Sequence, residues 1–251
     1  MIKVIINGCN GRMGKMISDL LAEDADAAVA AGVDAYGDAP QDIPFFRDIK
    51  ECDVDADVII DVSTAAAVDG VLDYAVERTI PIVLCTTGLS EEQTARMRED
   101  AKKTAVLKSA NMSLGINTIL KLASAAAKVF AEAGFDIEIV EKHHRQKLDA
   151  PSGTALAIAD AMNEAIGGDY EYCFDRSDRR QKRPEKEIGI SAVRGGTIVG
   201  EHEVIFAGTD EVIEIRHMAY SRAVFAKGAV QAAKFLAGKE PGMYGMSDVI
   251  G

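Results

Sequence analysis

The sequence predicts an α/β protein with a Rossmann-like, mostly parallel sheet domain and a second, α+β domain. Through the first half of the 251 residues, short apolar runs alternate with amphipathic stretches, which is typical of parallel strands joined by crossover helices. After about Asn111 the pattern changes, and from Ile188 onward apolar residues recur with a period close to two, which indicates antiparallel strands. We therefore expect a dinucleotide-binding domain over residues 1–114, completed by residues 222–251, and a second domain over residues 115–221.

Each domain has an expected order of elements. In the first domain, helices are expected from the glycine-rich turn to Leu21, around Val71–Ala75 and after a cap at Ser90, between strands at Ile2–Asn7, Ala27–Val33, Val58–Val62, Ile80–Leu84 and Ala105–Leu107. In the second domain, we expect helices at Ile116–Ala131 and Thr154–Ile166, a loop over Gly168–Glu187, and strands at Asp136–Val140, Ile188–Val193, Ile198–Phe206 and Val212–Ile215. A final helix at Ala223–Leu236 is expected to return to the first domain.

Composition and charge exclude several classes of protein. The formal net charge of −12 disfavours a nucleic acid partner, and acidic residues interleave with the basic stretch from Arg176 to Arg183, which we interpret as a solvated loop. No extended apolar run approaches 18 residues, so we expect no membrane partner. The four cysteines match no metal or disulfide spacing, and the N-terminus enters a strand without a secretory signal. We therefore expect no metal, reduced thiols and a cytoplasmic location.

Three glycines, Gly8, Gly11 and Gly14, lie between the first strand and the first helix, where a dinucleotide pyrophosphate binds. They allow backbone N–H groups to approach the pyrophosphate, the positive end of the helix dipole faces it, and Arg12 adds a cation. The spacing G-x-x-G-x-x-G is a weaker signal than G-x-G-x-x-G, so a tight turn that needs a positive φ is the alternative interpretation.

Asp34 ends the second strand about 20 residues beyond the last glycine, where a carboxylate accepts hydrogen bonds from the adenosine ribose. It would repel a 2′-phosphate, and the following Ala35 supplies no adjacent arginine, so we expect NADH to be preferred and NADPH to be less favoured. The alternative is a surface aspartate. The loops Cys85–Gly88 and Ser109–Met112 follow the fourth and fifth strands, and they either line the nicotinamide side of the crevice or are ordinary polar turns.

The segment from His143 to Thr154 holds two of the four histidines and has the highest density of titratable and polar residues suited to catalysis. Ser152 is a good N-cap, and the N–H groups of Gly153 and Thr154 would lie in the first helical turn, where an anion is stabilised, with Lys147 or Arg145 as a fixed cation. His143 and Lys147 are a candidate acid/base pair. The alternatives are a zinc site, which adjacent histidines on opposite faces of a strand would form poorly, and an exposed polar turn. His202 and His217 are expected to be structural.

With these motifs, the chain resembles the 4-hydroxy-tetrahydrodipicolinate reductase (dihydrodipicolinate reductase) family over essentially its whole length. The matching segments are GCNGRMG at Gly8–Gly14, CTTG at Cys85–Gly88, SANMSLGIN at Ser109–Asn117, HHRQKLDAPSGTA at His143–Ala155, RGGTIVGEH at Arg194–His202 and the ending Gly242–Val249. The resemblance implies reduction of a small cyclic dicarboxylate in lysine and diaminopimelate biosynthesis by NADH or NADPH.

By position, the resemblance implies that His143 exchanges protons and Lys147 donates one. It places the substrate against His144, Ser152, Gly153 and Thr154. It places the cofactor against Gly8, Cys9, Asn10, Gly11, Arg12, Met13, Asp34, Cys85, Thr86, Thr87, Ser109, Ala110, Asn111 and Met112. It also implies a homotetramer joined through the sheets of the second domain.

Two departures and two rival functions accompany the resemblance. Cys85 stands where the family usually has glycine, and Ala35 where some relatives have arginine, which weakens the case for NADPH. Another nicotinamide-dependent dehydrogenase, such as an aspartate dehydrogenase, or an NADH-sensing regulator would share the glycine turn. Neither needs the segment His143–Thr154, so that segment favours the reductase.

Overall fold

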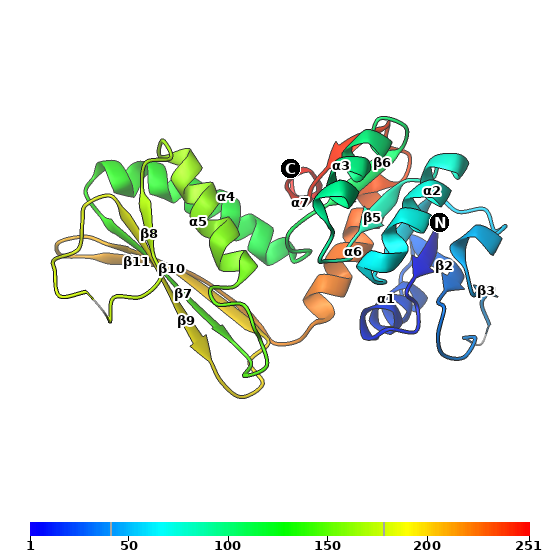
Figure 1. Ribbon diagram of the computed structural model, residues 1–251, viewed down its shortest axis with the longest axis horizontal. Coiled ribbons are helices and arrows are strands. Elements are labelled where there is room, and N and C mark those ends of the chain that lie inside the picture. Colours follow the sequence, from blue (N-terminus) through cyan, green and yellow to red (C-terminus); the bar gives the residue numbers. More distant parts are fainter. Residues whose placement is uncertain (41, 178) are drawn as a thin grey trace. The chain divides into compact units, whose positions relative to one another are not determined.

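Two units make up the fold of the computed structural model, which describes residues 1–40, 42–177 and 179–251 (Figure 1). Unit 1 contains Met1–Ser113 and Ala223–Gly251, and unit 2 contains Leu114–Arg222. Both chain termini therefore belong to unit 1. The predicted loop over Gly168–Glu187 lies partly outside the described residues.

A seven-stranded parallel sheet forms the middle layer of unit 1. Its order is β12-β6-β5-β4-β1-β2-β3, and every neighbouring pair is parallel. The strands are β1 (Ile2–Asn7), β2 (Ala27–Val33), β3 (Phe45–Phe46), β4 (Val58–Asp61), β5 (Ile82–Leu84), β6 (Ala105–Lys108) and β12 (Gly242–Tyr244). The strand order reverses between β1 and β4, and ligands of such sheets bind beyond the carboxyl ends of the strands at this reversal.

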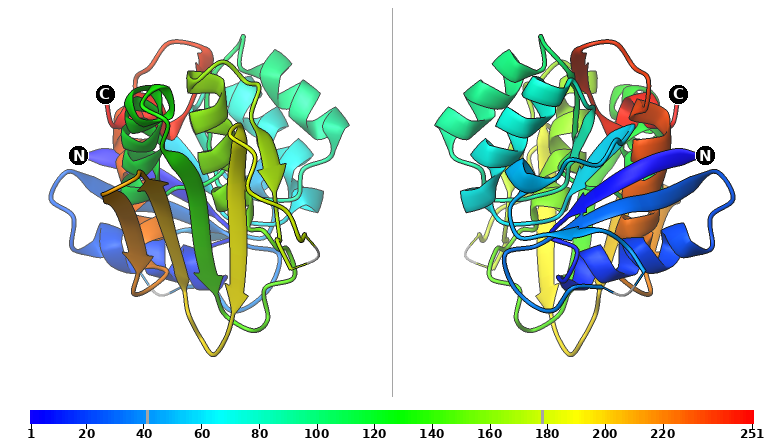
Figure 2. Two further views of the ribbon diagram at one scale, coloured as in Figure 1. Left: turned by 90° about the vertical axis from the view of Figure 1, so that its left-hand side faces the viewer. Right: turned by 90° about the vertical axis from the view of Figure 1, so that its right-hand side faces the viewer.

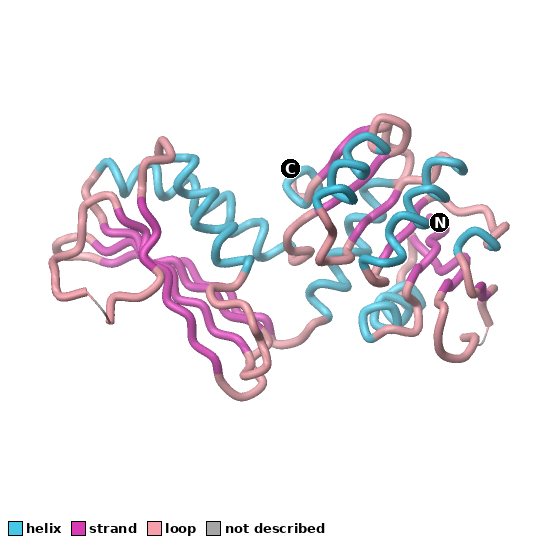
Figure 3. The backbone as a smooth tube through the Cα atoms, viewed as in Figure 1, coloured by secondary structure: helices cyan, strands magenta, loops and turns pink. Residues whose placement is uncertain are grey.

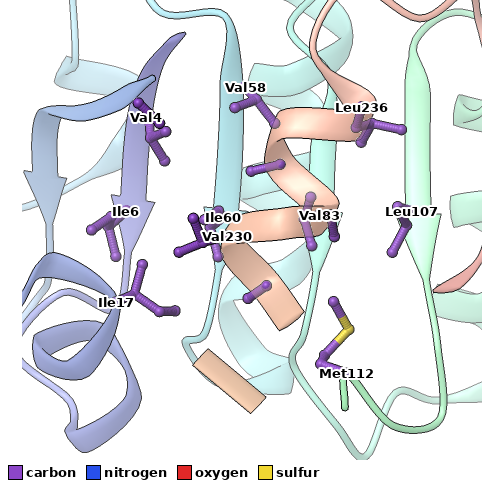
Figure 4. Packing of buried hydrophobic residues seen from close by; sticks show 14 of the residues in the cluster. Val4, Ile6, Ile17, Val58, Ile60, Val83, Leu107, Met112, Val230 and Leu236 are labelled. Atoms are coloured by element: carbon purple, nitrogen blue, oxygen red, sulfur yellow. The ribbon is translucent and has the colours of Figure 1, made fainter. Parts of the chain in front are cut away.

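Helices cover both faces of this sheet. The helices of unit 1 are α1 (Arg12–Ala22), α2 (Val68–Arg78), α3 (Glu91–Asp100), α6 (Ala223–Leu236) and α7 (Met246–Val249). Side chains from α1 and α6, such as Ile17 and Val230, pack on Val4 and Ile60 of one face (Figure 4). Side chains from α2 and α3 pack on Ile5, Ile59 and Ile82 of the other face. Successive strand residues are buried on opposite faces, which explains the continuous apolar runs.

A five-stranded mixed sheet forms unit 2, in the order β11-β10-β7-β9-β8 (Figure 2). The strands are β7 (Asp136–His143), β8 (Glu171–Cys173), β9 (Glu187–Arg194), β10 (Gly200–Ala207) and β11 (Val212–Ala219). The pairs β10–β11 and β10–β7 are antiparallel, whereas β7–β9 and β8–β9 are parallel. The prediction of antiparallel strands from Ile188 onward is therefore right for the pair β10–β11 and wrong for β9, whose two partners are parallel to it.

Helix α5 (Gly153–Ala165) connects β7 to β8, and these two strands run in the same direction on either side of β9. A chain that returns through a helix re-enters the sheet in the direction in which it left. The short strand β8 lies in the segment that we had expected to be a loop, because the polar residues around it hid its periodicity. Strand β3 was missed for a similar reason, since it spans only two residues after a loop that contains Pro40 and Pro44.

Helices α4 (Leu114–Glu132) and α5 cover one face of the mixed sheet (Figure 3). Ile119 and Ala123 of α4 are buried against this sheet and α5. By length and composition α4 also meets the criteria for a membrane span, with a mean hydropathy of 1.3 over 18 residues, of which 28% are buried. Lys121 and Lys128 interrupt the apolar residues of this helix, and a single helix of this kind is weak evidence for a membrane span.

Candidate active site

The glycine turn after β1 is tightly packed. Gly8 adopts φ +87°, and a Cβ there would lie 2.9 Å from the backbone N of Ser63. A Cβ at Gly14 would lie 2.2 Å from the carbonyl oxygen of Gly8, so this glycine lets α1 approach the strand. Gly11 is the N-cap of α1. The tight turn therefore requires these glycines. It also brings its backbone N–H groups close to the N-terminus of α1, as a dinucleotide pyrophosphate would need.

Asp34 lies beside this turn. Its Oδ2 accepts a hydrogen bond from the backbone N of Asn10 at 2.9 Å, and its Oδ1 accepts one from the backbone N of Tyr36 at 3.0 Å. A cleft of about 600 Å³ joins Gly8, Gly11 and Asp34. One bond to each oxygen holds the carboxylate in the wall of this cleft, where it can still accept further hydrogen bonds.

The same cleft is lined by two cations, Arg47 and Lys50, which sequence reasoning missed. Phe46 of β3 pairs with Val33 of β2, and the carbonyl oxygen of Phe46 accepts the Asp34 N–H at 3.1 Å. Arg47 therefore follows on the neighbouring strand at the level of Asp34, and its guanidinium lies 4.9 Å from the ring centre of Phe45. Only strand pairing reveals this proximity, because 13 residues separate the two in sequence.

A second hollow, of about 390 Å³, gathers the two loops expected on the nicotinamide side. It is lined by Met13, Val62, Ser63, Cys85, Thr86, Thr87, Ser109, Ala110, Asn111, Met112 and Phe225. Among the other expected cofactor residues, the Cys9 side chain is buried in the core and Arg12 is exposed at the start of α1. Burial, and then the charge of Asp61, raise the pKa of the Cys85 thiol to about 12, so this thiol is neutral at physiological pH.

Asp61, a fully buried residue that sequence reasoning also missed, joins the strand ends beneath this hollow. It ends β4, and its carboxylate accepts hydrogen bonds from Asn7 Nδ2 at 2.7 Å, Ser63 Oγ at 2.6 Å and Thr86 Oγ1 at 2.5 Å. Lys108, at the end of β6, donates to the carbonyl oxygen of Thr86 at 2.5 Å. Burial lowers the pKa of Lys108. A polar network thus fixes the carboxyl ends of four neighbouring strands.

In unit 2, His143 is the last residue of β7 and is 8% exposed. The strand continues three residues past its predicted end at Val140, so His143 lies within it. Alternate strand residues share a face, and Glu141 accordingly lies beside His143, with its Oε2 2.6 Å from Nδ1 of the imidazole. Had we extended the strand to His143, the period of two would have revealed this carboxylate.

Glu141 is fully buried and accepts four hydrogen bonds. Two come from Arg194 of β9, at 2.7 and 2.6 Å, one from His143, and one from the backbone N of Ser152 at 2.9 Å. Burial alone would raise the pKa of Glu141, but the bonds from Arg194, His143 and Ser152 outweigh it and lower this pKa. Glu141 is therefore an ionised acceptor, and Nδ1 of His143 carries the hydrogen between them.

The His143 imidazole is surrounded by several charges. Burial lowers its pKa, Glu141 opposes this effect, and Lys147 and Arg194 reinforce it, so the net pKa is below the ordinary value. His202 of β10 lies 5.1 Å away, ring centre to ring centre, and its Nε2 is 3.1 Å from Ser152 Oγ. The free protein therefore holds a mostly neutral His143 at pH 7, with Nε2 carrying the lone pair.

Lys147 and the start of α5 together hold a carboxylate of the chain itself. Asp149 Oδ1 lies 2.8 Å from Lys147 Nζ, and Asp149 Oδ2 accepts the Gly153 N–H at 3.4 Å. Ser152 is the N-cap, accepting the Ala155 N–H at 3.2 Å, and it is 1% exposed. Its buried hydroxyl therefore supports the helix start from behind, whereas Lys147, Gly153 and the first turn form an anion site.

His144 follows the end of β7 and is half-buried, whereas His143 is buried. It lines a hollow of about 440 Å³ with Arg145, Gln146, Gly196, Thr197 and Arg222. Thr197 and Arg222 were not predicted, because the sequence gives no sign that they approach His144. Three of the six lining residues are arginine or histidine, so this hollow also favours an anion.

Comparisons with known proteins identify the family. Residues 2–112 match the family model "Dihydrodipicolinate reductase, N-terminus", and residues 115–250 match "Dihydrodipicolinate reductase, C-terminus". The chain belongs to the dihydrodipicolinate reductase family. It is 52% identical to the 4-hydroxy-tetrahydrodipicolinate reductase of Caldanaerobacter subterraneus subsp. tengcongensis and 48% identical to that of Clostridium novyi, in each case over 100% of this chain and 98% of the relative.

Solved structures show the same fold. The dipicolinate-bound dihydrodipicolinate reductase from Paenisporosarcina sp. TG-14 superposes with a TM-score of 0.83 at 24% identity, covering 99% of each chain. The DAP dehydrogenase of C. glutamicum superposes with a TM-score of 0.57 at 15% identity, covering 100% of this chain and 95% of the other. The predicted fold class is confirmed, and this reductase is an oxidoreductase that uses a nicotinamide cofactor.

Proposed function

We propose that this chain reduces 4-hydroxy-tetrahydrodipicolinate to tetrahydrodipicolinate in lysine and diaminopimelate biosynthesis. The observation that carries the proposal is the constellation of His143, Glu141 and the Lys147–Gly153 anion site at the end of the central strand β7, in a chain of this reductase family. An NADH-sensing regulator would need no such buried acid/base group. The Paenisporosarcina reductase was solved with dipicolinate bound, which supports a small cyclic dicarboxylate as the ligand.

The reaction removes one water from the ring and adds one hydride and one proton. A nicotinamide bound to unit 1 would supply the hydride. The Lys147 ammonium and the first turn of α5 would bind one substrate carboxylate, displacing Asp149. The negative charges of the substrate would raise the pKa of His143, because an anion within a few ångströms favours the imidazolium. Glu141 would stabilise the imidazolium until His143 delivers its Nε2 proton to the reduced ring. The proton that Lys147 donates would go to the departing hydroxyl, and the proton that the ring loses as water is eliminated balances it.

For the cofactor, we propose that the cleft at Gly8, Gly11 and Asp34 takes the pyrophosphate and adenosine ribose, and that Cys85–Thr87 and Ser109–Met112 face the nicotinamide. The Asp34 carboxylate favours NADH, and NADPH is the less favoured alternative. The side chain of Cys85 occupies space that a glycine would leave, and its neutral thiol adds no charge there.

We also infer a cytoplasmic homotetramer, joined through the mixed sheet of unit 2. Alternation along β11 places Val212, Glu214, Arg216 and Met218 on the face opposite the one that α4 and α5 cover, and Val193 of β9 lies on the same face. Val193 and Met218 are 44% and 38% exposed. Light scattering that gives the mass of a monomer at micromolar concentration would contradict this assembly.

The first experiment measures nicotinamide oxidation at 340 nm with freshly generated 4-hydroxy-tetrahydrodipicolinate, once with NADH and once with NADPH. Rapid turnover that falls about 10²- to 10⁴-fold in His143→Ala would support both the reaction and its proton donor. Tight NADH binding without turnover would overturn the proposed reaction, and near-normal turnover of His143→Ala would overturn the role of His143. Equal efficiency with the two cofactors would contradict the preference for NADH.

A further inference from the structure

We propose that Glu141 is a positioning residue, which fixes the His143 imidazole with its hydrogen on Nδ1 and couples it to the start of helix α5. This inference rests on the proposed function for its catalytic consequence. Its structural part, the state of the imidazole, can be measured without any substrate.

The two oxygens of Glu141 divide their partners between the acid/base group and the anion site. Oε2 accepts from His143 Nδ1 at 2.6 Å and from one Arg194 nitrogen at 2.7 Å. Oε1 accepts from the Ser152 N–H at 2.9 Å and from the other Arg194 nitrogen at 2.6 Å. A rotation or displacement of this one carboxylate would therefore move both the imidazole and the residue that caps α5.

Arg194 makes this buried charge tolerable and anchors it. A carboxylate with no exposed surface needs a partner, and a bidentate guanidinium is the strongest that a protein offers. Arg194 also donates to the carbonyl oxygen of Asp149 at 2.7 Å, in the loop between His143 and α5. The guanidinium thereby holds the Glu141 carboxylate in one orientation and ties the same loop to β9.

The charged and titratable groups around His143 come from three strands and one loop. They are Glu141 on β7, Arg194 on β9, His202 on β10 and Lys147 in the loop, and His217 on β11 lies against His202. Among these, Glu141 is the one that favours the imidazolium. Its removal leaves His143 facing positive charges, so the protonated form would be reached only at lower pH.

A Glu141→Gln substitution separates position from charge. The amide places an NH₂ group where an oxygen now accepts two hydrogen bonds, so a donor must face either His143 and Arg194, or Ser152 and Arg194. In the first orientation, the imidazole must turn its lone pair to Nδ1 and carry its hydrogen on Nε2. Glu141→Asp keeps the charge on a chain that is one methylene shorter, and it should recover part of the function.

The experiment combines nitrogen-15 NMR of the four histidine side chains with pH profiles of kcat and KM. In the wild type, we expect neutral His143 to be protonated on Nδ1. In Glu141→Gln, we expect that tautomer to lose population, the pKa of His143 to fall, kcat at pH 7 to drop at least about tenfold, and its decline with rising pH to begin at lower pH. The change in KM should be smaller than that in kcat.

Glu187→Gln is the matched control, because Glu187 is a glutamate of the same sheet, 2% exposed and paired with Arg176 and Arg179. It begins β9, whereas Arg194 ends it. This variant should lose stability and keep the tautomer of His143 and the pH profile.

Two results would overturn the inference: a wild-type His143 that is protonated on Nε2, or a Glu141→Gln protein that keeps the wild-type tautomer and pH profile. If Glu141→Gln does not fold, the tautomer of His143 in the wild type and the pH profile of kcat for Glu141→Asp still test the inference. An absence of turnover with 4-hydroxy-tetrahydrodipicolinate would overturn the proposed function and leave the tautomer result intact.

Discussion

The Thr86 hydroxyl donates a hydrogen bond of 2.5 Å to Asp61, and this bond links the ends of β5 and β4 beneath the hollow that Thr86 lines. Asp61 accepts further bonds from Asn7 and Ser63, so one buried carboxylate holds side chains from successive strand ends in register. Ser63 lines both the Asp34 cleft and the Cys85–Thr87 hollow. The two halves of the proposed cofactor site are therefore connected through Asp61.

Asp61→Asn should weaken both stability and cofactor binding. The amide replaces an acceptor by a donor among groups that donate, and each unsatisfied buried partner costs about 1–3 kcal/mol. We expect the free energy of unfolding in urea to fall by about that amount and the KM for the cofactor to rise several-fold. Asp57→Asn is the control, because Asp57 accepts one exposed hydrogen bond, from the Lys3 N–H. Equal effects of the two substitutions would argue against the network.

Gly228 of α6 sets the position of the Ser109–Met112 segment. A Cβ at Gly228 would lie 1.7 Å from the carbonyl oxygen of Met112, so Gly228→Ala must push this backbone away. We expect a loss of more than about 2 kcal/mol in the free energy of unfolding, from overpacking, and a rise in the KM for the cofactor. Gly70→Ala, at a helical glycine with no atom within 4 Å of its Cβ position, should instead stabilise the protein by up to about 1 kcal/mol. A stable Gly228→Ala protein with an unchanged KM would contradict this account.

Local patterns predicted most of unit 1 and less of unit 2. The bounds of β1 and β2 and the cap at Ser90 agree with the structure, because apolar runs and capping residues act within a few positions. Glu141 was missed because β7 was ended at Val140, although its alternation with His143 was readable. Local patterns could not predict the contacts of Arg194, Arg47 and Asp61. Strand pairing brings each of these residues to partners that are more than ten residues away in the sequence.

Arg47 should determine how well the enzyme uses NADPH. Arg47 lines the same cleft as Asp34, and no described carboxylate lies within ion-pair distance of its guanidinium in residues 1–40, 42–177 or 179–251. A charge-assisted hydrogen bond to a 2′-phosphate is worth about 1.5–3 kcal/mol, or roughly tenfold or more in affinity. Arg47→Ala should therefore lower kcat/KM with NADPH about tenfold or more and change kcat/KM with NADH less than about twofold.

Fragments of the cofactor test the same point by calorimetry. The wild type should bind 2′,5′-ADP more tightly than Arg47→Ala does, and the two proteins should bind 5′-AMP alike. Arg78→Ala serves as the control, because Arg78 also lies over an aromatic ring, that of Tyr74, at 5.5 Å, and it is not among the residues of the Asp34 cleft. If Arg47→Ala bound both 2′,5′-ADP and 5′-AMP more weakly by the same factor, the arginine would support the cleft and would not recognise the 2′-phosphate.

His202 should make the protein less stable in mild acid. Burial, and then the neighbouring His143, lower the pKa of His202 from 6.5 to about 3. Between these two values the unfolded chain binds one more proton than the folded chain, so the free energy of unfolding falls as the pH falls below about 6.5, by about 1.4 kcal/mol per pH unit at most. The lowered pKa values of His143 and His217 act in the same direction. Urea unfolding between pH 7.5 and pH 4.5 measures this slope.

His202→Gln removes the titrating ring and keeps a polar group near Ser152. It should therefore reduce the slope of the free energy of unfolding against pH by up to about 1.4 kcal/mol per pH unit, which is the contribution of one proton. Ser152→Ala removes the 3.1 Å contact between Ser152 and His202 and leaves the histidine in place. It should lower the free energy of unfolding by about 1 kcal/mol at every pH and keep the wild-type slope. If the slope disappears with Ser152→Ala and persists with His202→Gln, the acid sensitivity belongs to another group, and burial of neutral His202 is not its cause.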